Sequence, residues 1–360
     1  MQTARTVLLC EGAFADFGTS KTAYGILRFS PESVVAVIDS TNAGRDAFEV
    51  SGLGRGIPVV RDLEAALAFS PRRLVIGIAT VGGVLPPALR KIVFTALEKG
   101  LEVHNGLHEM LADNPELAAA AKRGGGGIVD LRREPENLEV GTLRAQQVPA
   151  CVVLTVGTDC NTGKMTTALE LVREAAGCGI ESRFCATGQT GIAIAGWGIA
   201  IDHVLSDFTA GAAEWLVLEA GKDKKVRLIA VEGQGALAQP VYSGVTLSLM
   251  HGCLPDAMIL CHRADQDKIE VVDTPMPPLT EHIRLYEEAM RLVKPAKVKA
   301  LAINTRGLEQ EEALRLLEEA SRSTGLPATD PVRFGAEKLL EALLREDLRK
   351  IPLYSGGPAS

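Results

Sequence analysis

The chain has 360 residues, of which 46% are hydrophobic and 23% charged, as in ordinary globular proteins, and this length predicts two domains. The net charge of −7 and an aromatic content of only 4% argue against a nucleic-acid partner. No apolar run is long enough to span a bilayer, the N-terminus does not resemble a signal peptide, and seven cysteines suggest a reducing compartment. We therefore expect a cytoplasmic homo-oligomer that acts on a small-molecule substrate, without a membrane or nucleic-acid partner.

The first half alternates short apolar strands with helices, which predicts a Rossmann-like parallel sheet in residues 1–148. The expected strands are Thr6–Cys10, Ser33–Ile38, Ile57–Val60, Arg73–Ile78 and Leu101–His104, and the expected helices are Asp62–Phe69, Pro86–Lys99 and one that begins at His108. His108 follows a strand end, where α/β sheets bind ligands, but it could equally be an ordinary helix-start residue.

Asp39 ends the second strand, where dinucleotide-binding folds place a ribose-binding carboxylate. The first strand lacks the G-x-G-x-x-G pattern, so we expect a strand-end cap rather than NAD binding. Four glycines within Lys122–Gly127 predict a loop, because glycine destabilises helices. The polar stretch from Ile128 to Pro149 predicts the domain boundary.

The second half is organised around Val152–Leu171, which reads VVLTVGTDCNTGKMTTALEL. A buried strand ends at Gly157, and a helix begins at Gly163-Lys164. This arrangement would direct the loop amides, the helix dipole and the lysine charge at one point. It predicts a polyphosphate-binding loop, which we call the cradle. The spacing exceeds that of G-x4-G-K-[ST] by one residue, and Met165 replaces the hydroxyl that would bind Mg²⁺. The alternative is an ordinary glycine-rich turn.

Further strands and helices follow the cradle, and their polar strand ends should meet at one rim. The expected strands are Ser182–Ala186, Val226–Val231, Ala257–Cys261 and Val298–Ile303, and the expected helices are Phe208–Ala220, Ser243–Met250, Leu279–Val293, Glu309–Thr324 and Ala336–Arg345. The loop Thr187–Gly191 should lie at the same rim. The apolar face of Leu279–Val293 could be core or subunit contact.

Two strand-end residues are candidates for ligand binding. Glu232 could hold Mg²⁺ directly or through water, or it could be a buried carboxylate that loop amides satisfy. Asn304 could read a purine edge or form an Asx turn. Zinc is not expected, because His251, Cys253 and the Cys261-His262 pair lack C-x2-C spacing.

The second half resembles dethiobiotin synthetase and its P-loop relatives. The shared features are the longer loop spacing, Gly157-Thr158-Asp159 and the strand end Val231-Glu232-Gly233-Gln234-Gly235. This resemblance implies ATP and Mg²⁺, with Lys164 on phosphate, Glu232 on the metal side and Asn304 at the base. That family's catalytic lysine has no counterpart after the strand that ends near Cys185.

Over the whole chain, the pattern is similar to the family of D-glutamate N-acetyltransferases called DgcN. The shared strings are GTDCNTGKMTT, ATGQTG, SDFTAGAAE and VEGQGAL. This resemblance implies transfer of an acetyl group from acetyl-CoA to the amine of an acidic D-amino acid. A P-loop domain spanning residues 149–360 would then hold the phosphates of coenzyme A rather than ATP.

Two sets of residues follow as candidates for the site. The cofactor-binding set is Gly157, Thr158, Asp159, Cys160, Asn161, Thr162, Gly163, Lys164, Met165, Thr166, Thr167 and Asn304. The remaining candidates, chosen from their place at strand ends or in nearby loops, are the bases His251, His262 and Asp207 and the substrate-binding residues Gln189, Glu232, Arg263 and Arg306.

Overall fold

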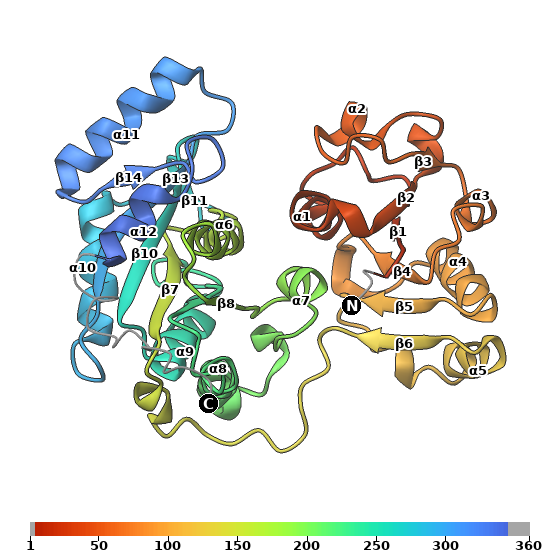
Figure 1. Ribbon diagram of the computed structural model, residues 1–360, viewed down its shortest axis with the longest axis horizontal. Coiled ribbons are helices and arrows are strands. Elements are labelled where there is room, and N and C mark those ends of the chain that lie inside the picture. The colour runs from red at the N-terminus through yellow and green to blue at the C-terminus, as the bar shows by residue number, and fades with distance from the viewer. Residues whose placement is uncertain (1–3, 345–360) are drawn as a thin grey trace, which may run out of the picture. The chain divides into compact units, whose positions relative to one another are not determined.

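The computed structural model describes residues 4–344, and the chain divides into two compact units (Figure 1). The first unit comprises Met1–Glu134 and Gly188–His203, and the second comprises Pro135–Thr187 and Val204–Ser360. Each unit contains a six-stranded sheet in which every pairing is parallel. None of the described helices is long and apolar enough to cross a membrane.

The first unit is a doubly wound sheet with the strand order β3-β2-β1-β4-β5-β6. Its strands are β1 Thr6–Leu9, β2 Val34–Ile38, β3 Val59–Val60, β4 Arg73–Ile76, β5 Glu102–Asn105 and β6 Gly127–Asp130. Its helices are α1 Lys21–Phe29, α2 Ala47–Ser51, α3 Leu63–Leu67, α4 Pro87–Glu98, α5 Pro115–Gly124 and α7 Gln189–Ala195. The order reverses between β1 and β4, as in Rossmann folds, so the predicted fold class is confirmed.

The glycine-rich stretch is not the predicted loop. Helix α5 continues into the first of the four glycines, Gly125 ends it with a φ of +75°, and β6 begins at Gly127. A Cβ at Gly124 would lie 2.0 Å from the Leu97 carbonyl oxygen. Glycine is therefore required because α5 approaches the backbone of α4 too closely for a side chain. The helix expected to begin at His108 begins only at Pro115, where the Asn114 side chain caps it.

The expected loop after the second unit's β8 (Ser182–Cys185) contains a helix, α7, which begins at Gln189. This helix packs with the first unit, where the hydroxyls of Thr22 and Thr190 are 2.9 Å apart. Figure 1 shows α7 beside α1. The chain thus leaves the second unit after Thr187 and returns at Val204, which the sequence pattern did not indicate.

Asp39 has a structural role in the first unit. Its side chain is fully buried and accepts hydrogen bonds from the backbone of Gly12 and Phe14 and from the backbone and hydroxyl of Thr41. These bonds make it the cap of the turn after β2, with its oxygens engaged by the protein itself.

The second unit has the strand order β14-β13-β10-β7-β9-β8. Besides β8, its sheet contains β7 Cys151–Gly157, β9 Leu228–Val231, β10 Ala257–Arg263, β13 Lys297–Asn304 and β14 Ala328–Thr329, and a separate hairpin pairs β11 Lys268–Ile269 with β12 Thr274–Pro275. Its helices are α6 Lys164–Gly177, α8 Thr209–Ala220, α9 Ser243–Cys253, α10 Leu279–Met290, α11 Gln310–Thr324 and α12 Glu337–Leu344. Arg345, expected in the last helix, lies outside the described residues. Every residue of β7 is buried, as expected for a central parallel strand.

A buried carboxylate attaches the polar stretch before β7 to α8. Glu214 of α8 is 1% exposed and accepts hydrogen bonds from the backbone and side chains of Thr142 and Arg144. Burial raises the pKa of Glu214, but these hydrogen bonds outweigh burial and hold the pKa below its ordinary value. On the same helix, a Cβ at Gly211 would lie 1.7 Å from the Glu139 carbonyl oxygen.

We expect Glu214→Ala to lower the free energy of unfolding by about 3 kcal/mol, because it leaves buried donors without an acceptor. Guanidinium titration monitored by circular dichroism measures the change. Glu219→Ala on the same helix is the control. Its partner Lys222 is 70% exposed, and such surface ion pairs contribute little, so the effect of Glu219→Ala should stay within about 0.5 kcal/mol. Equal losses in the two variants would contradict the structural role of Glu214.

Candidate phosphate-binding site

The cradle is built from the carboxyl end of β7, the loop 158–163 and the first turn of α6. Asn161 and Gly163 have φ values of +57° and +97°, so the loop turns through the left-handed region before the helix. Thr158, Asp159 and Thr162 are buried, and α6 has no side-chain cap at its first residue. The uncapped amides at its N-terminus suit an anion.

Lys164 lies inside this loop rather than on its surface. Its residue is 6% exposed, and Nζ donates to the Asp159 carbonyl oxygen at 2.7 Å. Burial lowers the pKa of Lys164, although the nearby thiols of Cys160 and Cys261 and the carboxylates of Asp159 and Glu232 act in the opposite direction. A Cβ at Gly157 would lie 2.9 Å from Nζ, so glycine is required there. A phosphate would give the buried ammonium its missing counter-charge.

Glu232 lies at the end of β9, on the strand next to the cradle. It is 6% exposed, and its Oε2 accepts the backbone N–H of Thr187 at 2.9 Å. A Cβ at the following Gly233 would lie 1.7 Å from the Thr155 carbonyl oxygen and 3.1 Å from Lys164 Cδ. The VEG strand end therefore packs directly against β7 and the lysine.

The donor set for Mg²⁺ is sparse. Met165 offers a thioether, and the hydroxyl of Thr167 accepts from the Cys261 thiol at 3.5 Å. No three His, Cys, Asp or Glu side chains among residues 4–344 form a metal cluster. A Mg²⁺ at Glu232 would thus take most of its ligands from phosphate and water, with Thr166 as the remaining hydroxyl in the first turn.

Asp159 connects the cradle to residues 264–276, which we call the hairpin segment because they contain β11 and β12. Its Oδ2 accepts from Gln266 Nε2 and from the Glu270 backbone, both at 2.6 Å, and its Oδ1 accepts from Gln239 Nε2 at 3.3 Å. The Asn161 amide also donates to Glu270, at 3.1 Å. Neither glutamine belongs to a motif that the sequence pattern reveals, so these contacts were not predicted.

Arg263 ends β10 at the base of the hairpin segment. Its guanidinium forms two hydrogen bonds of 3.0 Å with Asp265 and one of 2.9 Å with Glu270. Both partners are carboxylates, so the geometry is that of a carboxylate clamp. A substrate carboxylate that used Arg263 would replace one of these acidic side chains.

The structure brings only one of the three candidate bases close to the loop. His262 Nδ1 is 2.9 Å from the Thr158 hydroxyl, and burial lowers its pKa to about 4. His251 lies near the C-terminal end of α9, where its Nε2 is 3.1 Å from the Ala289 carbonyl oxygen. Since α9 runs back from the carboxyl ends of the strands, His251 lies near the opposite edge of the sheet. Asp207 is exposed in the turn before α8.

The remaining predicted residues are dispersed. Asn304 ends β13, beside β10, and its Oδ1 accepts the Arg306 backbone N–H at 3.0 Å, which is the Asx-turn geometry. Arg306 itself is exposed. Gln189 begins α7 in the first unit, and a Cβ at Gly106 would lie 2.9 Å from its Cγ.

Tyr286 of α10 is a site residue that sequence reasoning missed. It is fully buried, donates to the Gly157 carbonyl oxygen at 2.7 Å and accepts from the Leu237 N–H at 3.1 Å. His282 and Met290 share its buried face. Their spacing of four residues predicted an amphipathic helix but not its partner, so the contact with the cradle became visible only in the structure.

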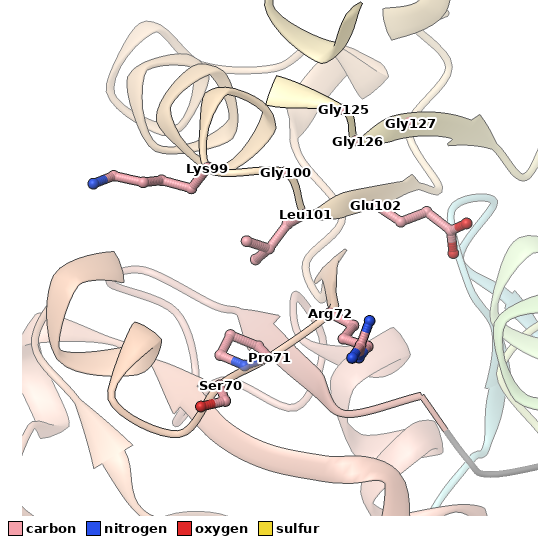
Figure 2. A pocket seen from close by; sticks show the side chains of 10 residues that line it. All are labelled: Ser70, Pro71, Arg72, Lys99, Gly100, Leu101, Glu102, Gly125, Gly126 and Gly127. Carbon is pink, nitrogen blue, oxygen red and sulfur yellow. The ribbon is translucent and has the colours of Figure 1, made fainter. Parts of the chain in front are cut away.

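The first unit carries two further polar features. Near the ends of β5 and β6, the rings of His108 and His203 lie 6.3 Å apart, and Arg132 forms an ion pair with Asp202. A hollow of about 430 Å³ lies at the starts of β4, β5 and β6 (Figure 2). It occupies the amino edge of the sheet, whereas α/β sheets bind ligands at the carboxyl edge.

Comparison with known proteins matches both halves of the chain. Residues 139–340 match the model "Domain of unknown function (DUF1611_C) P-loop domain", and residues 40–134 match the "DUF1611_N Rossmann-like domain". A protein from Tritonibacter scottomollicae named D-glutamate N-acetyltransferase is 37% identical over 93% of this chain and 97% of its own length. A protein of the same name from a Pseudoalteromonas species is 34% identical over 77% of this chain and 83% of its own length.

A solved structure is similar over nearly the whole chain. The crystal structure of a DUF1611 family protein from Anabaena variabilis is 41% identical, covers 95% of this chain and 100% of its own, and superposes with a TM-score of 0.90.

We expect His262 to make stability depend on pH. Its folded-state pKa is about 4 and its unfolded value about 6.5, so below pH 6.5 only the unfolded state gains the proton. The free energy of unfolding should therefore fall as pH drops from about 6.5 to about 4 and be unaffected above that range. His262→Gln should flatten this part of the profile in denaturant titrations, and parallel profiles for the two proteins would refute the assignment.

Proposed function

Because the chain belongs to the DUF1611 family, we propose that it is an N-acetyltransferase that moves the acetyl group of acetyl-CoA to the amine of D-glutamate. The observation that carries this proposal is identity of 34% and 37% to two proteins of that name, over most of each chain. Both matches include the cradle and the strand end at Glu232, so the features that could bind a donor fall within the matched region.

The cradle supports the choice of donor. Coenzyme A carries a pyrophosphate and a 3′-phosphate, and a loop with buried Lys164 and uncapped helix amides can hold such groups. Acetyl transfer moves no phosphoryl group. The missing hydroxyl at Met165 therefore does not count against this reaction, whereas it weakens the metal shell that phosphoryl transfer requires.

The chemistry makes three demands on the site. The amine nitrogen must lose a proton, form a bond to the thioester carbonyl carbon and expel the thiol of coenzyme A as the C–S bond breaks. Attack needs the two reactants held close together and donors for the developing oxyanion. His262 is neutral above its low pKa, so it can accept a hydrogen bond from the amine, and the Thr158 hydroxyl fixes its ring.

A second candidate is an ATP- and Mg²⁺-dependent ligase or kinase that acts on a carboxylate. Glu232 favours it, because a buried strand-end carboxylate beside a P-loop lysine is the usual metal-side group.

Incubation with D-glutamate and either acetyl-CoA or ATP-Mg²⁺ separates the two reactions. Thiol release detected with a disulfide reagent supports acetyl transfer, and ADP release supports the alternative. If the variant Met165→Thr hydrolysed ATP, the result would indicate an ATP-using ancestor.

We expect Lys164→Met to weaken binding of coenzyme A by about tenfold or more, because it removes a charged donor and keeps the length of the side chain. Isothermal titration calorimetry measures the affinity. Lys222→Met is the matched control, since this lysine is 70% exposed just after α8 and forms an ion pair with Glu219 of that helix. Unchanged affinity in Lys164→Met would place the donor outside the cradle.

A further inference from the structure

The imidazole of His282 is buried without a hydrogen-bond partner. The residue is 1% exposed, and among the described residues neither Nδ1 nor Nε2 finds a donor or acceptor. Burial lowers the pKa of His282, so the ring is neutral at pH 7, with one N–H to donate and one nitrogen to accept. Buried polar groups are nearly always satisfied, so an orphaned ring in a native fold calls for a functional explanation.

His282 lies against the phosphate cradle. Tyr286, one helical turn further along α10, hydrogen-bonds to the Gly157 carbonyl oxygen, so this face of α10 is turned toward the start of the loop. The negative charge of Asp159 acts on His282 and opposes the effect of burial, and His282 in turn influences His262. The ring thus lies in the neighbourhood of Asp159 and His262.

A second orphaned atom belongs to the same neighbourhood. Gln266 Nε2 donates to Asp159 Oδ2 at 2.6 Å, while Gln266 Oε1 is buried and unpartnered in the part of the chain that the structure describes. Two independent elements, α10 and the hairpin segment, therefore each present an unsatisfied polar atom near one buried carboxylate.

Asp159 itself lacks a cationic partner. Its carboxylate is fully buried, and the four hydrogen bonds recorded for it come from neutral amides, namely the backbone of Cys160 and Glu270 and the side chains of Gln239 and Gln266. Lys164 donates to the backbone oxygen of Asp159 instead of its carboxylate. Among the described residues, the Asp159 carboxylate is thus held by neutral donors, and no cationic side chain bonds to it directly.

We propose that Asp159, Gln266 and His282 form the binding position for the ammonium group of an amino-acid substrate. An alkylammonium has three N–H donors, and the carboxylate, the amide oxygen and the imidazole are three acceptors of the required kind. This inference rests on the proposed acetyl transfer, in which that nitrogen is the nucleophile. His282 binds and positions the amine before it reacts with the donor held by the cradle.

The hairpin segment borders the proposed position through its hydrogen bonds to Asp159. This segment is fastened to Asp159 by the hydrogen bonds of Gln266 and Glu270, and Val271 and Asp273 within it have φ values of +72° and +53°. A β-branched residue in the left-handed region is strained, so the segment is held in a costly conformation that its displacement would relieve. A shift of residues 270–273, which include both strained positions, would free Asp159 Oδ2 from the Glu270 backbone N–H for the substrate amine, while Gln266 keeps its place.

His282→Phe tests the inference, because it keeps a flat aromatic ring, slightly larger than imidazole, and removes both nitrogens. We expect KM for D-glutamate to rise by about tenfold or more, while KM for acetyl-CoA stays within twofold. The thermal midpoint should be equal or higher, since an orphaned polar ring is replaced by an apolar one. Calorimetric binding of glutarate, which lacks the amine, should be unchanged, so the preference for D-glutamate over glutarate should shrink.

Gln266→Met and the control Lys268→Met complete the test. Gln266 is partly exposed, so its variant should fold even if His282→Phe does not, and it should show the same selective loss of affinity for D-glutamate. Lys268 lies in the same segment but pairs with Asp273 on the surface, so its replacement should change neither KM.

Equal preferences for D-glutamate over glutarate in wild type, His282→Phe and Gln266→Met would overturn the inference and show that the orphaned atoms hold only water. The proposed function would still stand if the wild type released thiol from acetyl-CoA. Conversely, a wild type that bound D-glutamate more tightly than glutarate, yet released no thiol, would refute acetyl transfer and retain the amine position.

Discussion

The burial of one ammonium group determines the architecture of the candidate site. Lys164 can lie inside the loop after β7 because Gly157 and Gly233 place no side chain in its way and because its ammonium donates a hydrogen bond to the Asp159 carbonyl oxygen. A buried cation is costly unless it is paired, and burial already lowers its pKa. A bound anion would add a further negative charge beside this buried ammonium.

Asp159 extends this arrangement outward from the loop. Its backbone oxygen receives Lys164, while its side chain receives the hairpin segment through Gln266 and Glu270. Asp159 therefore connects the loop that would bind the donor to the hairpin segment. That segment carries Asp265 and Glu270, which form ion pairs with Arg263.

In both units, glycine and polar residues hold neighbouring segments against a parallel sheet, but they do so at different places. In the first unit, glycines 124 and 126 bring α5 against the backbone of α4 and the start of β5, and Asp39 uses its oxygens to hold the loop after β1. In the second unit, Glu214 and Gly211 perform the equivalent task for the stretch that precedes β7. Polar and glycine residues that look like functional signals in the sequence are in these cases structural.

Local pattern by itself determined the parallel α/β class, most strand positions and the glycine-lysine turn of the P-loop domain, because apolar periodicity and glycine-lysine spacing are properties of contiguous residues. Only the tertiary structure decided which distant residues meet that cradle. Tyr286 and His282 come from α10, Gln266 and Glu270 come from a hairpin without a motif, and His251 lies near the far edge of the sheet although its sequence neighbours suggested otherwise. The glycine stretch at 124–127 and the helix α7 were misjudged for the same reason. A glycine can end a helix or permit a close approach, and a segment can pack with either unit. Contacts across the fold decide both, and no short window of sequence contains them.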